Sequence, residues 1–124
     1  MTGPLAVFDL GKTNSKLFVF APDGSLLDER RTKPVWKDFR GRSVLDDARL
    51  FDWMSHELGE VAAAHGVTGM MVSAHGCAFA LVRGMELLHP ILDYEQEIPD
   101  RVAAVIGPIL PEFSETYTPW LPLG

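Results

Sequence analysis

The segment FDLGKTNSKLFVF, residues 8–20, constrains the fold of this chain more than any other. An apolar stretch over residues 5–8 ends at Asp9, and a second apolar stretch over residues 16–20 follows after a few polar residues. Two strands joined by so short a connection pair antiparallel, because a parallel partner needs a crossover of roughly a dozen residues or more. The connection contains Gly11, which allows the backbone to approach a ligand closely. The sequence therefore predicts a buried β-hairpin with a small polar tip.

The residues that follow are predicted to extend the hairpin into a meander. A turn at residues 21–24 contains Pro, which presets φ, and Gly, which accepts positive φ. This turn leads to a third predicted strand over residues 25–32. Residues 33–44 are rich in Pro, Gly and charge, and we expect a loop there.

A helix is predicted after this loop. Asp46 or Asp47 is expected to cap its N-terminus, and the helical spacing of apolar residues, Trp53 among them, continues to about His65. Gly66 stands where a helix commonly ends in the left-handed conformation. The helix therefore offers an apolar face to the meander.

The second half of the chain is predicted to return to the sheet. An apolar strand over residues 67–73 is interrupted by Ala-His-Gly. The elements expected after it are a strand over residues 77–82, a turn at 83–85, a returning strand over 86–88, and a helix over 98–110 kinked at Gly107-Pro108. Three antiparallel strands followed by a helix and a further strand indicate an α/β fold with a mixed sheet. The last segment, TPWLPLG, is not typical of the end of a domain.

Composition excludes several classes of function. With 124 residues the chain is one domain or part of one. Its net charge of −6 and its lack of a Lys/Arg cluster argue against a nucleic-acid partner. The single cysteine, Cys77, is expected to pack as a small apolar residue and is compatible with a reducing cytosol. No apolar run approaches the roughly 20 residues that span a bilayer, so we expect a cytoplasmic protein without a membrane partner.

The polar tip of the hairpin has the chemistry of a phosphate site. Backbone N–H groups in such a turn can form an anion-binding concavity, and Lys12 and Lys16 add positive charge. Asp9, at the end of a strand, suits a hydrated Mg²⁺, which is held by one or two carboxylates together with waters and phosphates. The P-loop pattern is absent, and the turn leads to a strand rather than a helix. A hairpin with an ordinary polar turn is the alternative interpretation.

Two stretches of the sequence resemble a known family. Residues 8–20 resemble the first phosphate motif of the actin-like ATPase superfamily, Asp-x-Gly-Thr/Lys-Thr-x-x-Lys/Arg between two strands. More narrowly, they resemble the FGGY carbohydrate kinases. Residues 72–95, VSAHGCAFALVRGMELLHPILDYE, resemble the segment in which these kinases enter the sugar site at a strand end and cross a hairpin.

The resemblance implies a ribonuclease-H-like (actin-like ATPase) mixed sheet with flanking helices, present in incomplete form. Residues 1–124 would be the N-terminal portion of the N-terminal domain of an ATP-dependent sugar kinase that uses Mg²⁺ and phosphorylates a ketose or deoxyketose. The catalytic base and most of the adenosine pocket of such a kinase lie outside this portion. The isolated chain would therefore contain no catalytic residue and would be inactive. The resemblance is compatible with a homodimer.

By resemblance, two groups of residues contact ligands. Asp9 would be linked to the metal, and the cofactor-binding residues would be Asp9, Gly11, Lys12, Thr13, Asn14 and Lys16. Lys12 departs from the commoner Thr at its position, and it either contacts phosphate or points to solvent. The sugar-binding residues would be His75, Gly76, Trp36 and Asp93.

Each sugar residue also has an alternative interpretation. The alternative for His75 is a histidine that hydrogen-bonds to the backbone in a tight turn. The alternative for Trp36 is a residue that anchors its loop. Asp93 is otherwise a capping residue beside a packed Tyr94. For the whole chain, the alternative to a kinase is a non-catalytic module of the actin-like fold that senses nucleotide or sugar. A small domain that uses the hairpin only as structure is a further alternative.

Overall fold

The computed structural model describes residues 3–117, and the segment TPWLPLG lies outside the described residues. The chain divides into two compact units. Unit 1 contains the described residues up to Trp36 together with Leu45–His75, and unit 2 contains Lys37–Val44 and the described residues from Gly76 onward.

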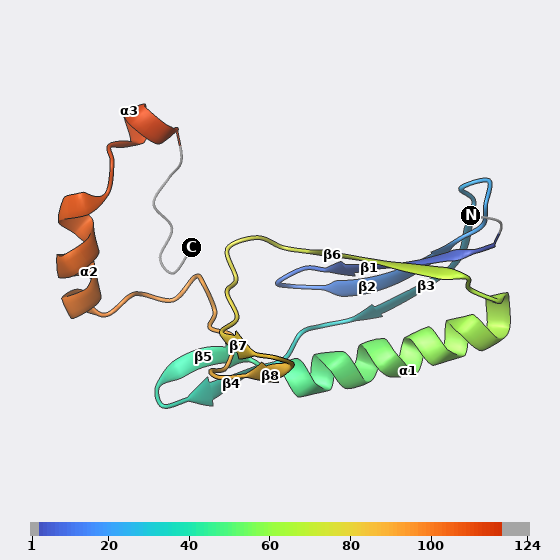
Figure 1. Ribbon diagram of the computed structural model, residues 1–124. Helices are drawn as coiled ribbons and strands as arrows, with labels where there is room; N and C mark the ends of the chain where they lie inside the picture. The colour runs from blue at the N-terminus through green and yellow to red at the C-terminus, as the bar shows by residue number, and fades with distance from the viewer. Residues whose placement is uncertain (1–2, 118–124) are drawn as a thin grey trace. The chain divides into compact units, whose positions relative to one another are not determined.

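Unit 1 is built on a four-stranded mixed sheet of order β3-β2-β1-β6. The first three strands, β1 (Leu5–Leu10), β2 (Ser15–Phe20) and β3 (Leu26–Thr32), form the predicted antiparallel meander. Strand β6 (Gly69–Ala74) pairs parallel with β1, which makes the sheet mixed as the sequence predicts. Helix α1 (Asp47–His65) runs along one face of this sheet (Figure 1).

The ends of α1 are set by the residues that the sequence identifies. The Asp46 carboxylate accepts a hydrogen bond from the Arg49 backbone N–H (3.4 Å), which caps the first turn. Gly66 has a φ of 64°, and its N–H donates to the Ala62 carbonyl (2.9 Å). Glycine adopts this left-handed conformation without steric cost, so the helix ends here.

An ion-pair cluster joins the end of α1 to β3. His65 Nε2 lies 3.1 Å from Asp28 Oδ2, and the Arg30 guanidinium lies 3.0 Å from the same oxygen. The hydrogen bond with His65, followed by that with Arg30, lowers the pKa of Asp28 below its ordinary value of 3.8. The cluster therefore favours the ionised carboxylate.

The core of unit 1 lies between the sheet and α1. Alternate residues of β1 and β2 and one residue of α1 are completely buried: Ala6, Phe8, Leu17, Val19 and Val61. Trp53 packs against this core, and its ring meets that of Phe8 edge to face at 6.0 Å. Ser15 shares this face and is also completely buried. The Ser15 hydroxyl therefore cannot reach a ligand at the hairpin tip.

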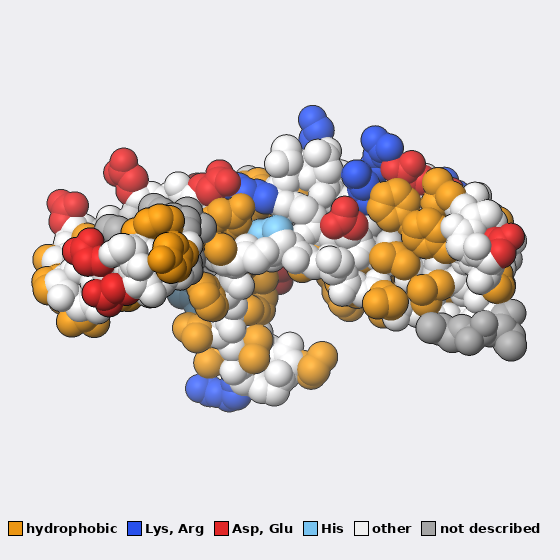
Figure 2. All heavy atoms as spheres, turned by 90° about the horizontal axis from the view of Figure 1, so that it is seen from above, with side chains coloured by type: hydrophobic (Ala, Val, Ile, Leu, Met, Phe, Trp, Pro, Cys, Tyr) orange, Lys and Arg blue, Asp and Glu red, His pale blue; other side chains and the backbone are white. Residues whose placement is uncertain are grey.

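The opposite face and one edge of the sheet are open in unit 1. Three consecutive residues of β6, Met70, Met71 and Val72, are each at least half exposed, on both faces of the strand. Figure 2, which views the molecule from the side away from α1, shows hydrophobic side chains among charged ones. An exposed edge strand presents unpaired backbone N–H and C=O groups with which a further strand can pair.

Unit 2 consists of short elements. A hairpin is formed by β4 (Trp36–Phe39) and β5 (Arg42–Leu45), whose outermost residues belong to unit 1. The remaining elements are β7 (Val82–Arg83), β8 (Glu86–Leu87), α2 (Asp100–Ile106), a 3₁₀ helix (Gly107–Ile109) and α3 (Phe113–Thr116). The predicted kink at Gly107-Pro108 is present as the change from α2 to the 3₁₀ helix. No helix within residues 3–117 is long and apolar enough to cross a membrane.

Three sequence predictions are wrong in this region. Residues 33–44 are not a loop throughout, because they contain β4 and most of β5, joined at Arg40 (φ 55°) and Gly41 (φ 77°). Two consecutive positive φ values match the two-residue hairpin turn that usually carries Asn-Gly, and Arg-Gly hides that signal. Of the strand predicted over residues 77–82, only Val82 lies in a strand. Cys77, the first residue of the predicted strand, has a φ of 66° and is not extended. Cys77 is exposed rather than packed.

Candidate functional site

The tip of the β1–β2 hairpin is closed by its own backbone. The Gly11 N–H donates to the Asn14 carbonyl (3.0 Å), so four residues, 11–14, connect the two strands. A Cβ atom on residue 11 would lie 2.7 Å from the Asn14 carbonyl oxygen, closer than real Cβ contacts. Glycine is therefore required here by the close approach of two backbone segments, with no positive φ involved.

The ends of three adjacent strands bring together residues from the two sequence motifs. On β1, Asp9 is the register partner of Lys16 on β2 and of Ser73 on β6. Register partners project from the same face of a sheet, with Cβ atoms roughly 5 Å apart in an antiparallel pair. Since Ala6 and Phe8 on β1 face α1, Asp9, Lys16 and Ser73 lie on the open face. A carboxylate, an ammonium group and a hydroxyl thus stand side by side.

The second motif enters at the same edge of the sheet as the hairpin tip. Strand β6 runs parallel to β1, so both carboxyl ends reach this edge. The His75 N–H donates to the Leu10 carbonyl (2.9 Å), which places His75 directly beside the start of the loop at Gly11. Ligands of open α/β sheets commonly bind at the carboxyl ends of parallel strands. The predicted phosphate motif and the start of the predicted sugar motif, residues 72–75, are therefore neighbours within unit 1.

Sequence reasoning missed Ser73. In the sequence it is only the last residue of an apolar strand, and no motif marks it. Its relation to Asp9 depends on the parallel register between β1 and β6, which joins residues 64 positions apart. The only available signal was a hydroxyl residue at the carboxyl end of a predicted strand, two residues before His75.

The other predicted cofactor residues occupy the loop and its flanks. Thr13 and Asn14 are exposed at the tip. Lys12 is partly buried, and its ammonium lies 5.8 Å from the centre of the Trp36 ring, within the range of a cation–π contact. Lys12 therefore does not simply point to solvent, and Trp36 contacts the hairpin through it. The Lys16 ammonium lies 5.8 Å from the Phe18 ring.

Two predicted sugar residues, Gly76 and Asp93, belong to unit 2. One Asp93 carboxylate oxygen accepts a hydrogen bond from the Glu95 N–H (3.0 Å), and the other accepts one from the Ser43 hydroxyl (3.4 Å). These contacts match the alternative interpretation of a turn-capping residue. A carboxylate has about four lone-pair positions, so capping is compatible with a further contact to a ligand.

Asp9 is a single carboxylate at the candidate metal position. Within the described residues no group of three or more His, Cys, Asp or Glu side chains is arranged to hold a metal ion. An exposed carboxylate beside a predicted phosphate-binding loop is a donor that Mg²⁺ accepts when phosphate oxygens and waters complete its octahedron. Asp9 therefore fits Mg²⁺ that arrives with a nucleotide and does not fit a structural metal.

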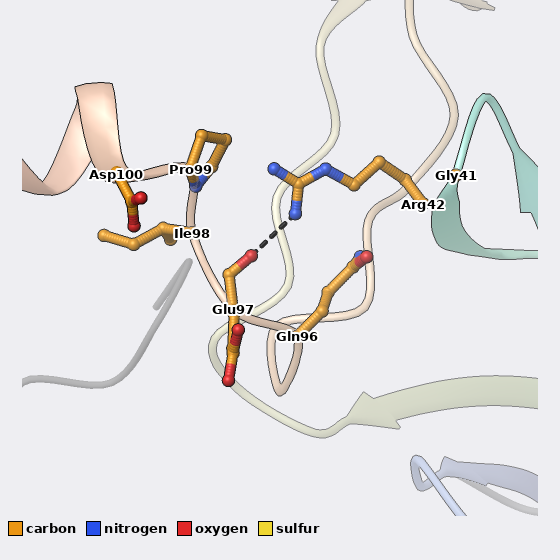
Figure 3. A pocket seen from close by; sticks show the side chains of 7 residues that line it. All are labelled: Gly41, Arg42, Gln96, Glu97, Ile98, Pro99 and Asp100. Carbon is orange, nitrogen blue, oxygen red and sulfur yellow. Dashed lines mark hydrogen bonds between the residues drawn. The ribbon is translucent and has the colours of Figure 1, made fainter.

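A surface hollow of about 500 Å³ in unit 2 is lined by Gly41, Arg42 and residues 96–100 (Figure 3). None of its lining residues was predicted as a site residue. One lining residue, Gln96, is hydrogen-bonded to Ser43, which in turn donates to Asp93.

Comparison with solved structures identifies similar proteins. A carbohydrate kinase from Novosphingobium aromaticivorans matches 98% of this chain with a TM-score of 0.87 and 35% sequence identity. A xylulose kinase from Lactobacillus acidophilus matches 86% of the chain with a TM-score of 0.69 and 13% identity. A glycerol kinase from Plasmodium falciparum, solved with ADP, matches 87% with a TM-score of 0.58 and 9% identity. The last two likenesses show the fold alone.

The match covers only part of each relative. The chain spans 26% of the length of the Novosphingobium kinase and 22% of the Lactobacillus kinase. No family model matches the chain, and no curated protein is detectably similar to it. Nearly the whole chain nevertheless follows a carbohydrate kinase in structure, with more than a third of aligned residues identical. The resemblance to carbohydrate kinases is therefore confirmed: this chain has part of their fold, the mixed sheet with flanking helices that its sequence predicts.

Proposed function

We propose that residues 1–124 are the N-terminal portion of the N-terminal domain of an FGGY-type carbohydrate kinase, which transfers the γ-phosphoryl group of ATP to a sugar hydroxyl. The alignment of Lys16, Asp9 and Ser73 at the end of three strands, beside the Gly11 loop, carries this proposal. The identity with the Novosphingobium kinase supports it. A cytoplasmic location, a small-molecule sugar as partner, and no nucleic-acid or membrane partner belong to the same proposal.

The hairpin supplies the phosphate side of the site. Backbone N–H groups of the loop after Gly11 can form an anion-binding concavity for a phosphate group. Lys16 and Lys12 offer positive charge, and Thr13 and Asn14 offer side-chain donors. Asp9 holds Mg²⁺, which neutralises charge on the phosphate oxygens when it is bound. Positioning and charge stabilisation of this kind are most of what phosphoryl transfer requires of a protein.

The strand end after β6 supplies the sugar side. His75 is fixed by its backbone bond to Leu10, so its position relative to the hairpin is set by the sheet. We assign His75, Gly76, Trp36 and Asp93 to sugar binding on the strength of the family resemblance. The preferred sugar is a ketose or deoxyketose, and the catalytic base is an aspartate outside this chain.

The test requires a polypeptide of full kinase length that contains this chain, called here the full-length kinase. It is incubated with Mg²⁺, ATP labelled in the γ-phosphate and a panel of ketoses and aldoses, and labelled sugar phosphate is measured. We expect transfer to at least one ketose, no transfer without Mg²⁺, and no transfer by the isolated 124-residue chain. Nucleotide or sugar binding without any transfer would instead identify the non-catalytic module.

A further inference from the structure

The side chain of Gln96 mimics a neighbouring β-strand. Its carboxamide oxygen accepts a hydrogen bond from the Ser43 backbone N–H (3.0 Å), and its amide nitrogen donates to the Ser43 carbonyl (2.7 Å). One side chain thus satisfies both backbone groups of a residue in β5, as a paired strand would. Both bonds have good length and join residues 53 positions apart in the sequence.

This pairing continues on both sides of Ser43. Val44 forms an isolated antiparallel bridge with Leu92. Arg42 donates through Nη1 to the Glu97 carbonyl (2.6 Å), a bond drawn in Figure 3 beside the Gln96 side chain. Three consecutive residues of β5 are therefore bonded to the segment 92–97. We call these contacts the β5 clamp.

The β5 clamp fixes the turn that contains Asp93. The Asp93 N–H donates to the same Ser43 carbonyl that accepts from Gln96 (3.0 Å). The Ser43 hydroxyl donates to one oxygen of the Asp93 carboxylate, and the Glu95 N–H donates to the other. Ser43 and the Glu95 N–H therefore orient this carboxylate together, and Gln96 holds Ser43.

We propose that Gln96 is a positioning residue for sugar binding, which acts by orienting the Asp93 carboxylate through Ser43. This rests on the proposed function, in which Asp93 contacts the sugar. A carboxylate held from two sides is preorganised for a sugar hydroxyl. Gln96 itself does not contact the sugar.

Steady-state kinetics of the full-length kinase test the proposal. Gln96→Leu removes both hydrogen bonds to Ser43. If the Asp93 carboxylate then loses its hydrogen bond to the sugar, the sugar KM should rise roughly tenfold, while the MgATP KM changes less than about twofold. Gln96→Glu still accepts from the Ser43 N–H but cannot donate to its carbonyl, so we expect an intermediate sugar KM. Glu97→Leu is the matched control, because it changes the adjacent side chain and keeps the carbonyl that binds Arg42.

A double-mutant cycle with Asp93→Ala identifies the route of the effect. If Gln96 acts through Asp93, adding Gln96→Leu to Asp93→Ala changes the sugar KM by less than about twofold. The proposal would be overturned if the two substitutions multiplied their effects on the sugar KM in the double variant. It would also be overturned if Gln96→Leu raised the MgATP KM as much as the sugar KM, or left the sugar KM normal. Melting curves of every variant separate these outcomes from unfolding. An inactive parent enzyme, or an Asp93→Ala variant with normal sugar KM, would instead refute the proposed function or its assignment of Asp93, and the positioning role with it.

Discussion

Substitution of Gly11 by alanine tests whether the hairpin tip is shaped by steric necessity. The added Cβ would lie 2.7 Å from the Asn14 carbonyl oxygen, where ordinary contacts begin at 3.4 Å. The position of a Cβ is fixed by the backbone and the Asn14 oxygen is itself a backbone atom, so neither can rotate away and the loop must open by several tenths of an ångström. Opening also stretches the hydrogen bond from the Gly11 N–H to the Asn14 carbonyl, now 3.0 Å.

The expected loss of stability follows from these contacts. Overpacking costs about 1–3 kcal/mol, and a weakened hydrogen bond about 0.5–1.5 kcal/mol. Replacing glycine restricts the unfolded chain, which returns about 0.4–1 kcal/mol. We therefore expect Gly11→Ala to lower the free energy of unfolding by about 1–3 kcal/mol.

The assay is urea denaturation of the chain, followed by circular dichroism at 222 nm, which reports on α1. The matched control is Gly59→Ala in that helix, where a Cβ meets open space. An alanine there should raise the stability by about 0.5–1 kcal/mol, because glycine is a poor helix former. A Gly11→Ala variant as stable as the parent would refute the steric explanation of the tip.

Three further predictions concern the sheet. The pKa of Asp28 in the folded state lies below its ordinary value of 3.8. The ionised carboxylate therefore stabilises the fold above the unfolded-state pKa, and this stability is lost as the pH falls through the folded-state pKa. The urea midpoint of Asp28→Asn should therefore depend less steeply on pH below about 4 than that of the parent. In the full-length kinase, Ser73→Ala should lower kcat/KM for MgATP about three- to tenfold, since it removes a hydroxyl beside Asp9, and a change below twofold would exclude Ser73 from the site. His75→Ala should raise the sugar KM roughly tenfold with little change for MgATP, whereas a well-folded variant with unchanged sugar KM would leave His75 as a turn residue.

Local sequence signals predicted the meander and α1 because the forces that form them act between near neighbours. Alternation of buried residues in β1 and β2 comes from the two-residue period of a strand. The limits of α1 follow from a cap at Asp46 and a left-handed glycine at Gly66, each readable within a few residues. The apolar residues of β1, β2 and α1 form one buried face, and keeping them on that face determines the register of the hairpin.

The remaining features depend on contacts between distant residues. The proximity of Ser73 to Asp9 follows from parallel pairing. Strand β5 is bonded to a side chain, Gln96, which no strand pattern could reveal. Cys77 lies in a segment whose backbone turns although its composition is typical of a strand. In each case the decisive interaction is tertiary and overrides local propensity.

The most direct measurement of the central claim is single-turnover transfer from γ-labelled ATP by the full-length kinase with Asp9→Asn. The amide keeps the size of the side chain and removes the charge that would hold Mg²⁺, so the fold and the melting temperature should be unchanged. Because Asp9 is exposed on the open face and is not part of the core, little packing is at stake. We predict that the rate of transfer falls by at least about a hundredfold at saturating Mg²⁺ and sugar. A folded Asp9→Asn enzyme that transfers phosphate at nearly the parent rate would contradict the claim that this hairpin is the metal and phosphate site.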